Sequence, residues 1–455
     1  MKKEKKIQNM LEGSPYLLLL KFSIPILIGS LIQQMYNMAD SVVVGQFVGL
    51  EALAAVGSTG SLMFTTLGFS LGLTAGFTVI VSQRFGAKDE QGLQSAIAMS
   101  VYLSLIIAVA MTLLGTIYAR SILKLLNTPE SILGYATDYL QCVFAGSIGL
   151  IFYNLASSVL RAVGDSRVPL YFLIFSSILN VLLDLLLVIV IPLGTTGAGL
   201  ATTIAQTISA ILVMFYIFKR RPELFPRKEY WKWNHNIVKS LLRLGVPSAF
   251  QNSVTGIGIL LMQVVVNGYG ATYVAAYAAA SKIQMFAMQP IVSIGIAVST
   301  FTGQNLGANL LKRIYQGVHQ GVIVIIVASL LGTSFSYFLC EPIALLFVDA
   351  TEVEVIEATK SYLRTISPFY ILLGLLYAYR SALQGIGNAI LPMLSGFLEL
   401  LLRIIATIVL PTIFGFVGVS LADVVAWIGA VILLVIGYYW QMKKCNQMSQ
   451  SEGST

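Results

Sequence analysis

Asp40 and Asp184 lie inside long apolar stretches of this 455-residue chain, and each is near other polar side chains at helical spacing. Asp184 follows Asn180 by four residues, and residues four apart share one face of a helix. Together with Asp40 and Thr202 they supply two carboxylates, an amide and a hydroxyl, an oxygen-rich set suited to a proton or a hard cation such as Na⁺. We therefore predict a cation site here. Further polar residues on the same helix faces are Gln33, Tyr36, Asn37 and Gln206.

The members of this set also fall at one depth. Measured from turns expected at Gly45, Pro192 and Gly197, the aspartates and the threonine lie roughly 7–12 Å below the outer surface. Burying a carboxylate inside a membrane costs roughly a few kcal/mol of free energy. Such a residue is therefore rare in a span and indicates a function. Alternatively, Asp40 caps a broken helix or is satisfied by Asn180 alone.

The second half of the chain carries other residues at the matching positions. Arg403 stands where Asn180 stands in the first half, and Asp423 stands where Thr202 stands. Because Glu399 lies one helical turn before Arg403, these three residues are expected to form a buried ion triad. In our interpretation the guanidinium, which cannot lose its proton, serves this half as a built-in cation. A second exchangeable ion site is the functional alternative.

Other side chains of the spans are candidates for a cavity or for the membrane surface. Lys282 either lines a central cavity, where it would repel or orient a substrate, or pairs with a carboxylate elsewhere. Met285 and Met288 are candidates for an adaptable cavity wall, although ordinary helix packing explains them better. Arg380 lies toward the end of its span and is expected to extend its charge to the membrane surface.

The composition of the chain requires a membrane. Hydrophobic residues make up 57% and charged residues 11%, against about 25% charged in soluble domains. A hydrocarbon core of about 30 Å is crossed by about 20 apolar residues. Twelve such stretches can be located, at approximately 17–44, 52–80, 94–118, 132–158, 168–190, 198–218, 237–266, 273–301, 315–339, 358–382, 391–410 and 418–440. We expect an all-α polytopic membrane protein.

The chain also repeats itself about 221 residues later. The segment 82–87 (SQRFGA) returns as 303–308 (GQNLGA), and 160–165 (LRAVGD) returns as 383–388 (LQGIGN). Six spans per half return the chain to its starting side, so the repeat is parallel, as in several secondary transporters. The sequence therefore predicts two six-helix lobes, with the substrate path at the repeat interface.

The distribution of positive charge predicts the orientation. Four lysines precede the first span, at positions 2, 3, 5 and 6, and residues 219–243 contain eight more basic side chains. The positive-inside rule then places both termini in the cytoplasm, in a multi-pass protein of the cell (inner or plasma) membrane. The basic linker divides the chain into an N-lobe, 1–225, and a C-lobe, 226–455. The net charge of +8 indicates topology, not nucleic-acid binding.

Metal and cofactor chemistry have no signature in this sequence. The two histidines and three cysteines are scattered without metal-ligand spacing, so we expect no metal and no cofactor besides the transported H⁺ or Na⁺. An intramembrane enzyme would need a nucleophile with a base or a metal cluster, and the scarcity of histidine argues against one. We expect a monomer whose partners are the bilayer and small drug-like molecules.

Several motifs, taken together, resemble the MATE family of multidrug and toxic compound extrusion transporters. They are the 36–40 segment (YNMAD) followed by 44–45 (VG), the repeated Gln83/Gly86 and Gln304/Gly307 pairs, and the 160–165 segment. The resemblance covers nearly the whole chain. It implies an exchanger that takes in Na⁺ or H⁺ and exports organic, often cationic, compounds.

The resemblance also implies which residues bind the ion. The family's N-lobe site falls on the four residues already selected by depth, Asp40, Asn180, Asp184 and Thr202. The NorM-like branch uses in addition a glutamate and an aspartate, whose aligned positions here hold Thr255 and Leu373. The C-lobe site is therefore expected to be absent, as in the DinF-like branch.

Two transport functions remain open from the sequence. The leading one is a cation-coupled antiporter that exports organic, cationic amphiphilic compounds. The other is a flippase or exporter of a lipid-linked precursor, which predicts a more strongly cationic cavity than Lys282 supplies.

Overall fold

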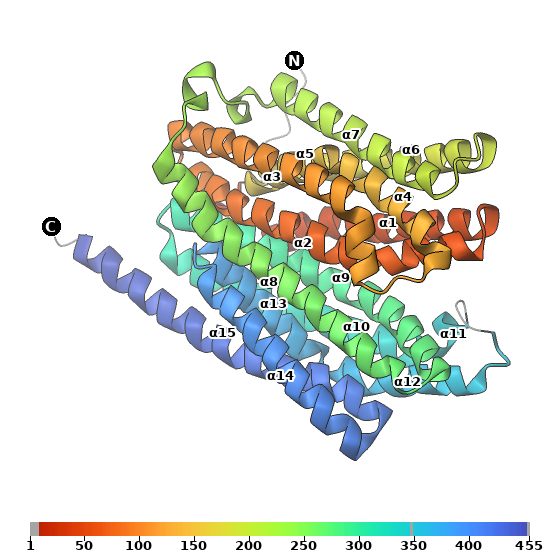
Figure 1. Cartoon of the computed structure of the whole chain (residues 1–455). Coiled ribbons are helices and arrows are strands. Elements are labelled where there is room, and N and C mark those ends of the chain that lie inside the picture. The colour runs from red at the N-terminus through yellow and green to blue at the C-terminus, as the bar shows by residue number, and fades with distance from the viewer. Residues whose placement is uncertain (1–8, 346–348, 453–455) are drawn as a thin grey trace. The chain divides into compact units, whose positions relative to one another are not determined.

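The computed structural model describes residues 9–345 and 349–452 and shows an all-helical chain (Figure 1). The four N-terminal lysines used to predict the orientation lie outside these described residues. In the described part, eleven helices are long and apolar enough to cross a membrane, and a pair bent by 48° makes the twelfth span. The predicted twelve-span fold class is confirmed.

The first half consists of α1 (Pro15–Phe47), α2 (Leu50–Gly86), α3 (Glu90–Leu125), α4 (Glu130–Ala145), α5 (Ser147–Ala162), α6 (Arg167–Asp184), the π-helical segment η1 (Leu185–Val190) and α7 (Gly194–Arg220). The 3₁₀ turns η2 (Pro222–Leu224) and η3 (Lys228–Trp231) form the linker. The second half consists of α8 (His235–Asn267), α9 (Ala271–Gly307), α10 (Leu311–Phe338), α11 (Cys340–Ala344), α12 (Val353–Ile366), η4 (Ser367–Phe369), α13 (Tyr370–Gly385), α14 (Ile390–Phe414) and α15 (Phe416–Glu452).

The backbone shows the same duplication as the sequence. Residues with left-handed φ recur at matching places in the two halves: Gly49 and Gly270 (120° and 93°), Lys88 and Asn309 (56° and 59°), Gly164 and Gly387 (95° and 88°), Gly194 and Gly415 (61° and 58°). Such φ values are rare outside glycine and asparagine. Four pairs in the same order show that equivalent turns join equivalent helices.

The chain forms two compact units, which differ from the predicted division at 225/226. Unit 1 contains residues 28–249, and unit 2 contains residues 10–27 and 250–455. The first turns of α1 join unit 2 because Met10, Leu19 and Phe22 are fully buried in that unit's core. The first turns of α8 join unit 1, where Val238 and Leu241 are buried. Each boundary falls two residues after a helix proline, Pro25 or Pro247.

Two irregularities in unit 1 position the polar residues. At the 48° bend between α4 and α5, Gly146 leaves room for Thr203, whose hydroxyl donates to the Cys142 carbonyl at 3.0 Å. Directly after Asp184, the helix widens into η1, and π-helical turns are frequent at functional sites. The outer turn expected at Gly45 is wrong, because α1 continues to Phe47 and the turn follows at 48–49.

Candidate functional site

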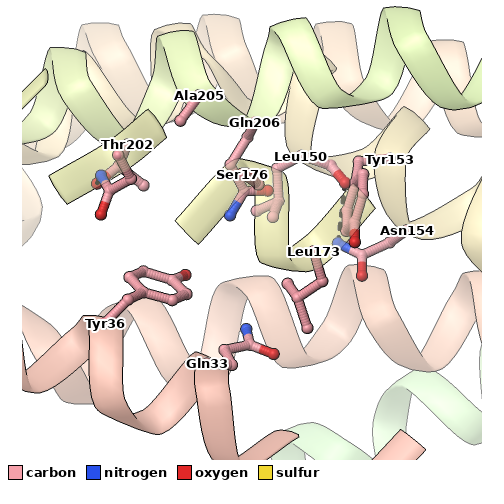
Figure 2. A pocket seen from close by; sticks show the side chains of 11 residues that line it. Gln33, Tyr36, Leu150, Tyr153, Asn154, Leu173, Ser176, Thr202, Ala205 and Gln206 are labelled. Atoms are coloured by element: carbon pink, nitrogen blue, oxygen red, sulfur yellow. Dashed lines mark hydrogen bonds between the residues drawn. The ribbon is translucent and has the colours of Figure 1, made fainter. Parts of the chain in front are cut away.

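A small polar cavity lies inside unit 1, between α1, α5, α6 and α7 (Figure 2). Its volume is about 40 Å³. It is lined by Gln33, Tyr36, Leu150, Tyr153, Asn154, Leu173, Ser176, Asn180, Thr202, Ala205 and Gln206. Tyr36 lies beside Gln33 and Gln206 in this lining, so the polar stripes of α1 and α7 meet across this space. The cavity has room for water or a small ion, whereas drug-sized ligands need about 300–1,000 Å³.

The structure brings together the four residues predicted from their depth. The side-chain amide of Asn180 is oriented so that both its nitrogen and its oxygen have a partner. The nitrogen donates to Asp40 Oδ1 at 2.9 Å, and the oxygen accepts from the Thr202 backbone N–H at 3.2 Å. The hydroxyl of Thr202 donates to the Ala198 carbonyl at 3.2 Å. Asp40 and Asp184 also interact electrostatically as neighbours. Three helices, α1, α6 and α7, therefore converge on one oxygen-rich cluster.

Asp184 is the unusual member of this cluster. Its side chain is buried, with 1% exposure, and neither carboxylate oxygen receives a hydrogen bond from any described residue. Its polar neighbour Asp40 is a second carboxyl group, which can donate only when it carries a proton. Buried acceptors without donors are costly, and two adjacent carboxylates cannot both remain ionised without a cation. A proton shared with Asp40, or a bound cation, would satisfy these oxygens.

The alternative in which Asp40 caps a broken helix is wrong, because α1 continues for seven residues beyond it. The other alternative was that Asn180 satisfies Asp40, and Asn180 does donate a hydrogen bond to Asp40. Asn180, however, leaves both oxygens of Asp184 without a donor. A structural role for Asn180 therefore does not remove the need for a cation.

Two differences from the predicted stripe appear. Asn37 is exposed and does not line the cavity. Tyr139 of α4 interacts electrostatically with Asp40, Asp184 and Tyr36, and the sequence did not indicate it. The polar residues of its own span, Thr137, Asp138 and Gln141, lie on other faces of the helix, so only the packing of α4 against α7 shows the proximity of Tyr139.

In unit 2 the structure brings the predicted ion triad together and adds a fourth member. Arg403 Nε donates to Asp423 Oδ1 at 2.7 Å, and its Nη2 donates to Glu399 Oε1 at 2.9 Å. The other oxygen of Glu399 accepts from Arg380 Nη2 at 3.0 Å. The expectation that Arg380 extends to the surface is wrong, because its exposure is 5%. Two arginines and two carboxylates make this network electrically balanced.

Local packing holds Arg403 in place. An added Cβ at Gly258 would lie 2.3 Å from Arg403 Nη1, so the missing side chain there makes room for the guanidinium. Thr407, the counterpart of Asp184, donates to the Arg403 carbonyl at 2.6 Å. The positions aligned with the NorM-like carboxylates carry none: Thr255 donates to the Gln251 carbonyl at 3.1 Å, and Leu373 is buried.

The remaining predicted residues separate in space. Met288 packs against the core of unit 2, as ordinary helix packing predicts, whereas Met285 is 40% exposed. Lys282 is also exposed, and it makes no ion pair among the described residues. The alternative in which a carboxylate neutralises Lys282 therefore finds no support in this structure.

Comparison with known proteins agrees with this architecture. The sequence matches the MatE family twice, over residues 25–186 and 247–409. A probable multidrug resistance protein of Bacillus subtilis, YpnP, is 33% identical over 68% of this chain and 69% of its own length. A second one, YoeA, is 26% identical over 94% and 95%. A solved structure of a MOP superfamily transporter from Pyrococcus furiosus superposes with a TM-score of 0.90 at 23% identity, over 98% of this chain and 100% of that one.

Proposed function

Because this chain belongs to the MatE family, whose members are transporters and not enzymes, we propose that it is a cation-coupled multidrug efflux antiporter. It exports organic, cationic amphiphilic compounds from the cytoplasm in exchange for H⁺ or Na⁺. It acts as a monomer in the cell membrane, with both termini in the cytoplasm. The printed names of the relatives, multidrug resistance and export proteins, support the export of drugs.

The observation that carries the coupling proposal is the buried Asp184. Neither of its oxygens has a donor among the described residues, and its carboxyl neighbour is Asp40. One proton placed between the two carboxyl groups would supply the missing donor. Na⁺ would satisfy the same oxygens as ligands, together with the oxygens of Asn180 and Thr202. We favour H⁺, since two adjacent carboxyl groups share one proton readily.

The cavity that Asn180 and Thr202 line is too small for the substrate. About 40 Å³ accommodates water or an ion but no drug-sized molecule. The substrate must therefore bind elsewhere, and the coupling must travel through a structural element. Such an indirect arrangement is the expected one for an exchanger whose substrates vary in shape.

Helix α1 is the element suited to transmit this coupling. It carries Asp40 in unit 1, while its first turns, up to Leu27, belong to unit 2. Pro25, just before the boundary, removes one helix hydrogen bond and permits a bend. A shift between two conformations from 1:99 to 99:1 needs about 5.5 kcal/mol of differential binding. Ion and substrate together can supply that energy.

Uptake into proteoliposomes that contain the purified full chain tests the proposal. The probe is the ethyl ester of rhodamine B, a permanently charged fluorescent cation. We expect a pH gradient to drive uptake above that of protein-free liposomes. Uptake that follows a Na⁺ gradient at constant pH, with no response to a pH gradient, would assign Na⁺ instead. Uptake that responds to neither gradient would contradict cation coupling.

A further inference from the structure

Lys282 of α9 carries a positive charge close to the middle of the membrane. The aromatic pair Tyr269 and Tyr273, with ring centroids 5.7 Å apart, lies at the outer start of α9, where tyrosines commonly mark the membrane interface. Lys282 follows Tyr273 by nine residues, or about 14 Å along the helix axis, and half of the hydrocarbon core is about 15 Å. A lysine side chain at this depth does not reach either surface easily.

The helix face that carries Lys282 does not have the composition of a lipid-facing surface. Its exposed members at helical spacing are Ala275, Ala278, Lys282 and Met285. By contrast, α10 exposes Ile323, Val327 and Leu331, and α14 exposes Leu401, Ile405 and Ile408. A lipid environment favours the second kind of face, whereas charged residues within spans face protein or water-filled space. The face of α9 is therefore suited to contact a solute.

The charges around this face leave Lys282 uncompensated. The buried ionic network of unit 2, formed by Arg380, Glu399, Arg403 and Asp423, balances its own charges through three ion pairs. None of the ion pairs among the described residues involves Lys282. An exposed, unpaired ammonium group in a medium of low dielectric attracts an anion strongly.

We propose that Lys282 is a specificity-determining residue that contacts an anionic group of the substrate, so that the transporter accepts zwitterionic amphiphiles that carry a carboxylate as well as plain cations. The neighbouring Met285 supplies a flexible apolar surface for the rest of such a molecule. The small side chains of Ala278 and Ala275, one and two turns away, leave space beside the ammonium group. This inference rests on the proposed export function and specifies its substrate class.

A matched pair of probes tests the proposal. Rhodamine B is a zwitterion with a free carboxylate, and its ethyl ester is the cation without it. In proteoliposomes, we expect Lys282→Gln to raise the KM for rhodamine B about tenfold or more, the range expected when a charged hydrogen-bond partner is lost. The KM for the ester should change less than about twofold. Lys282→Arg should restore transport of the zwitterion, and Lys239→Gln, at an exposed lysine of α8, should affect neither probe.

The outcomes separate this inference from the proposed function. Equal losses for both probes, or no change for either, would overturn the role of Lys282. Gradient-driven uptake of the ester without any uptake of rhodamine B would overturn it while the export function stands. If the wild-type protein transports neither probe, the proposed export function is wrong. The role of Lys282 is then tested by measuring the binding of rhodamine B. In fluorescence anisotropy with the purified chain, an unchanged Kd for rhodamine B in Lys282→Gln would overturn the inference, and a Kd about tenfold weaker would support it.

Discussion

Arg403 Nε lies 2.7 Å from Asp423 Oδ1, at the place in the second repeat where Asn180 meets Thr202 in the first. In unit 1 the amide and the hydroxyl are neutral, and the charge that satisfies the carboxyl groups must come from outside. In unit 2 the guanidinium is part of the chain and cannot leave. The repeat in unit 2 therefore contains its own cation, whereas we propose an exchangeable one for unit 1.

We expect Asp40→Asn to abolish coupling without preventing insertion. The amide keeps the size of the carboxyl group but is permanently neutral, so it can neither take up nor release the ion. Gradient-driven uptake of the rhodamine ester should fall to the level of protein-free liposomes, and Asp184→Asn should be impaired similarly. Glu51→Gln, at an exposed position near the start of α2, should transport normally. Wild-type uptake by Asp40→Asn would show that Asp40 has only a structural role.

The hydrogen bond from Asn180 to Asp40 predicts a difference between two asparagines. Asn180→Ala removes the donor 2.9 Å from Asp40, so the ion concentration that gives half-maximal uptake should change by about tenfold or more, the value of one hydrogen bond to a charged group. Asn37→Ala changes an exposed side chain that does not line the cavity, and its uptake curve should match the wild type. Equal effects of both substitutions would contradict the geometry of the site.

The network in unit 2 predicts a large loss of stability in Arg403→Met. Removing this guanidinium leaves Asp423 without its arginine and Glu399 with Arg380 alone, and breaking a buried pair costs about 3–5 kcal/mol. Thermal unfolding of the purified protein measures the loss. The control is Arg364→Met, at an exposed arginine that lies 5.3 Å from the Tyr337 ring. A stable Arg403→Met protein without transport would move the network from the structure into the mechanism.

Gly258 should tolerate no side chain. Because an added Cβ would lie 2.3 Å from Arg403 Nη1, and both neighbouring bonds hold that guanidinium in place, Gly258→Ala should lower the free energy of unfolding by about 1–3 kcal/mol. Gly57→Ala on α2 is the matched control, since no atom lies within 4 Å of its added Cβ. It should be at least as stable as the wild type, because alanine favours helix more than glycine does. Equal stabilities of the two variants would contradict the predicted crowding.

Most of the fold and part of the site could be predicted from sequence. The depth of a residue in the membrane can be counted along its own helix from the end of that helix. This count identified Asp40, Asn180, Asp184 and Thr202 as candidates. The same reasoning missed Tyr139 of α4, since the polar residues of that span, Thr137, Asp138 and Gln141, lie on other faces of the helix and do not select this tyrosine. The branch suggested by Thr255 and Leu373 remains a prediction.

The sequence by itself determined the twelve spans, their duplication and the residues at each depth, because apolar length, helical spacing and repeated motifs are all read along one chain. Only the tertiary structure decided which side chains meet. It placed Arg380 in the ion network. Glu399 has two oxygens, and the sequence does not show which arginine binds the second one. It also showed that Asp184 has no donor, because satisfaction of a buried group depends on every helix packed around it.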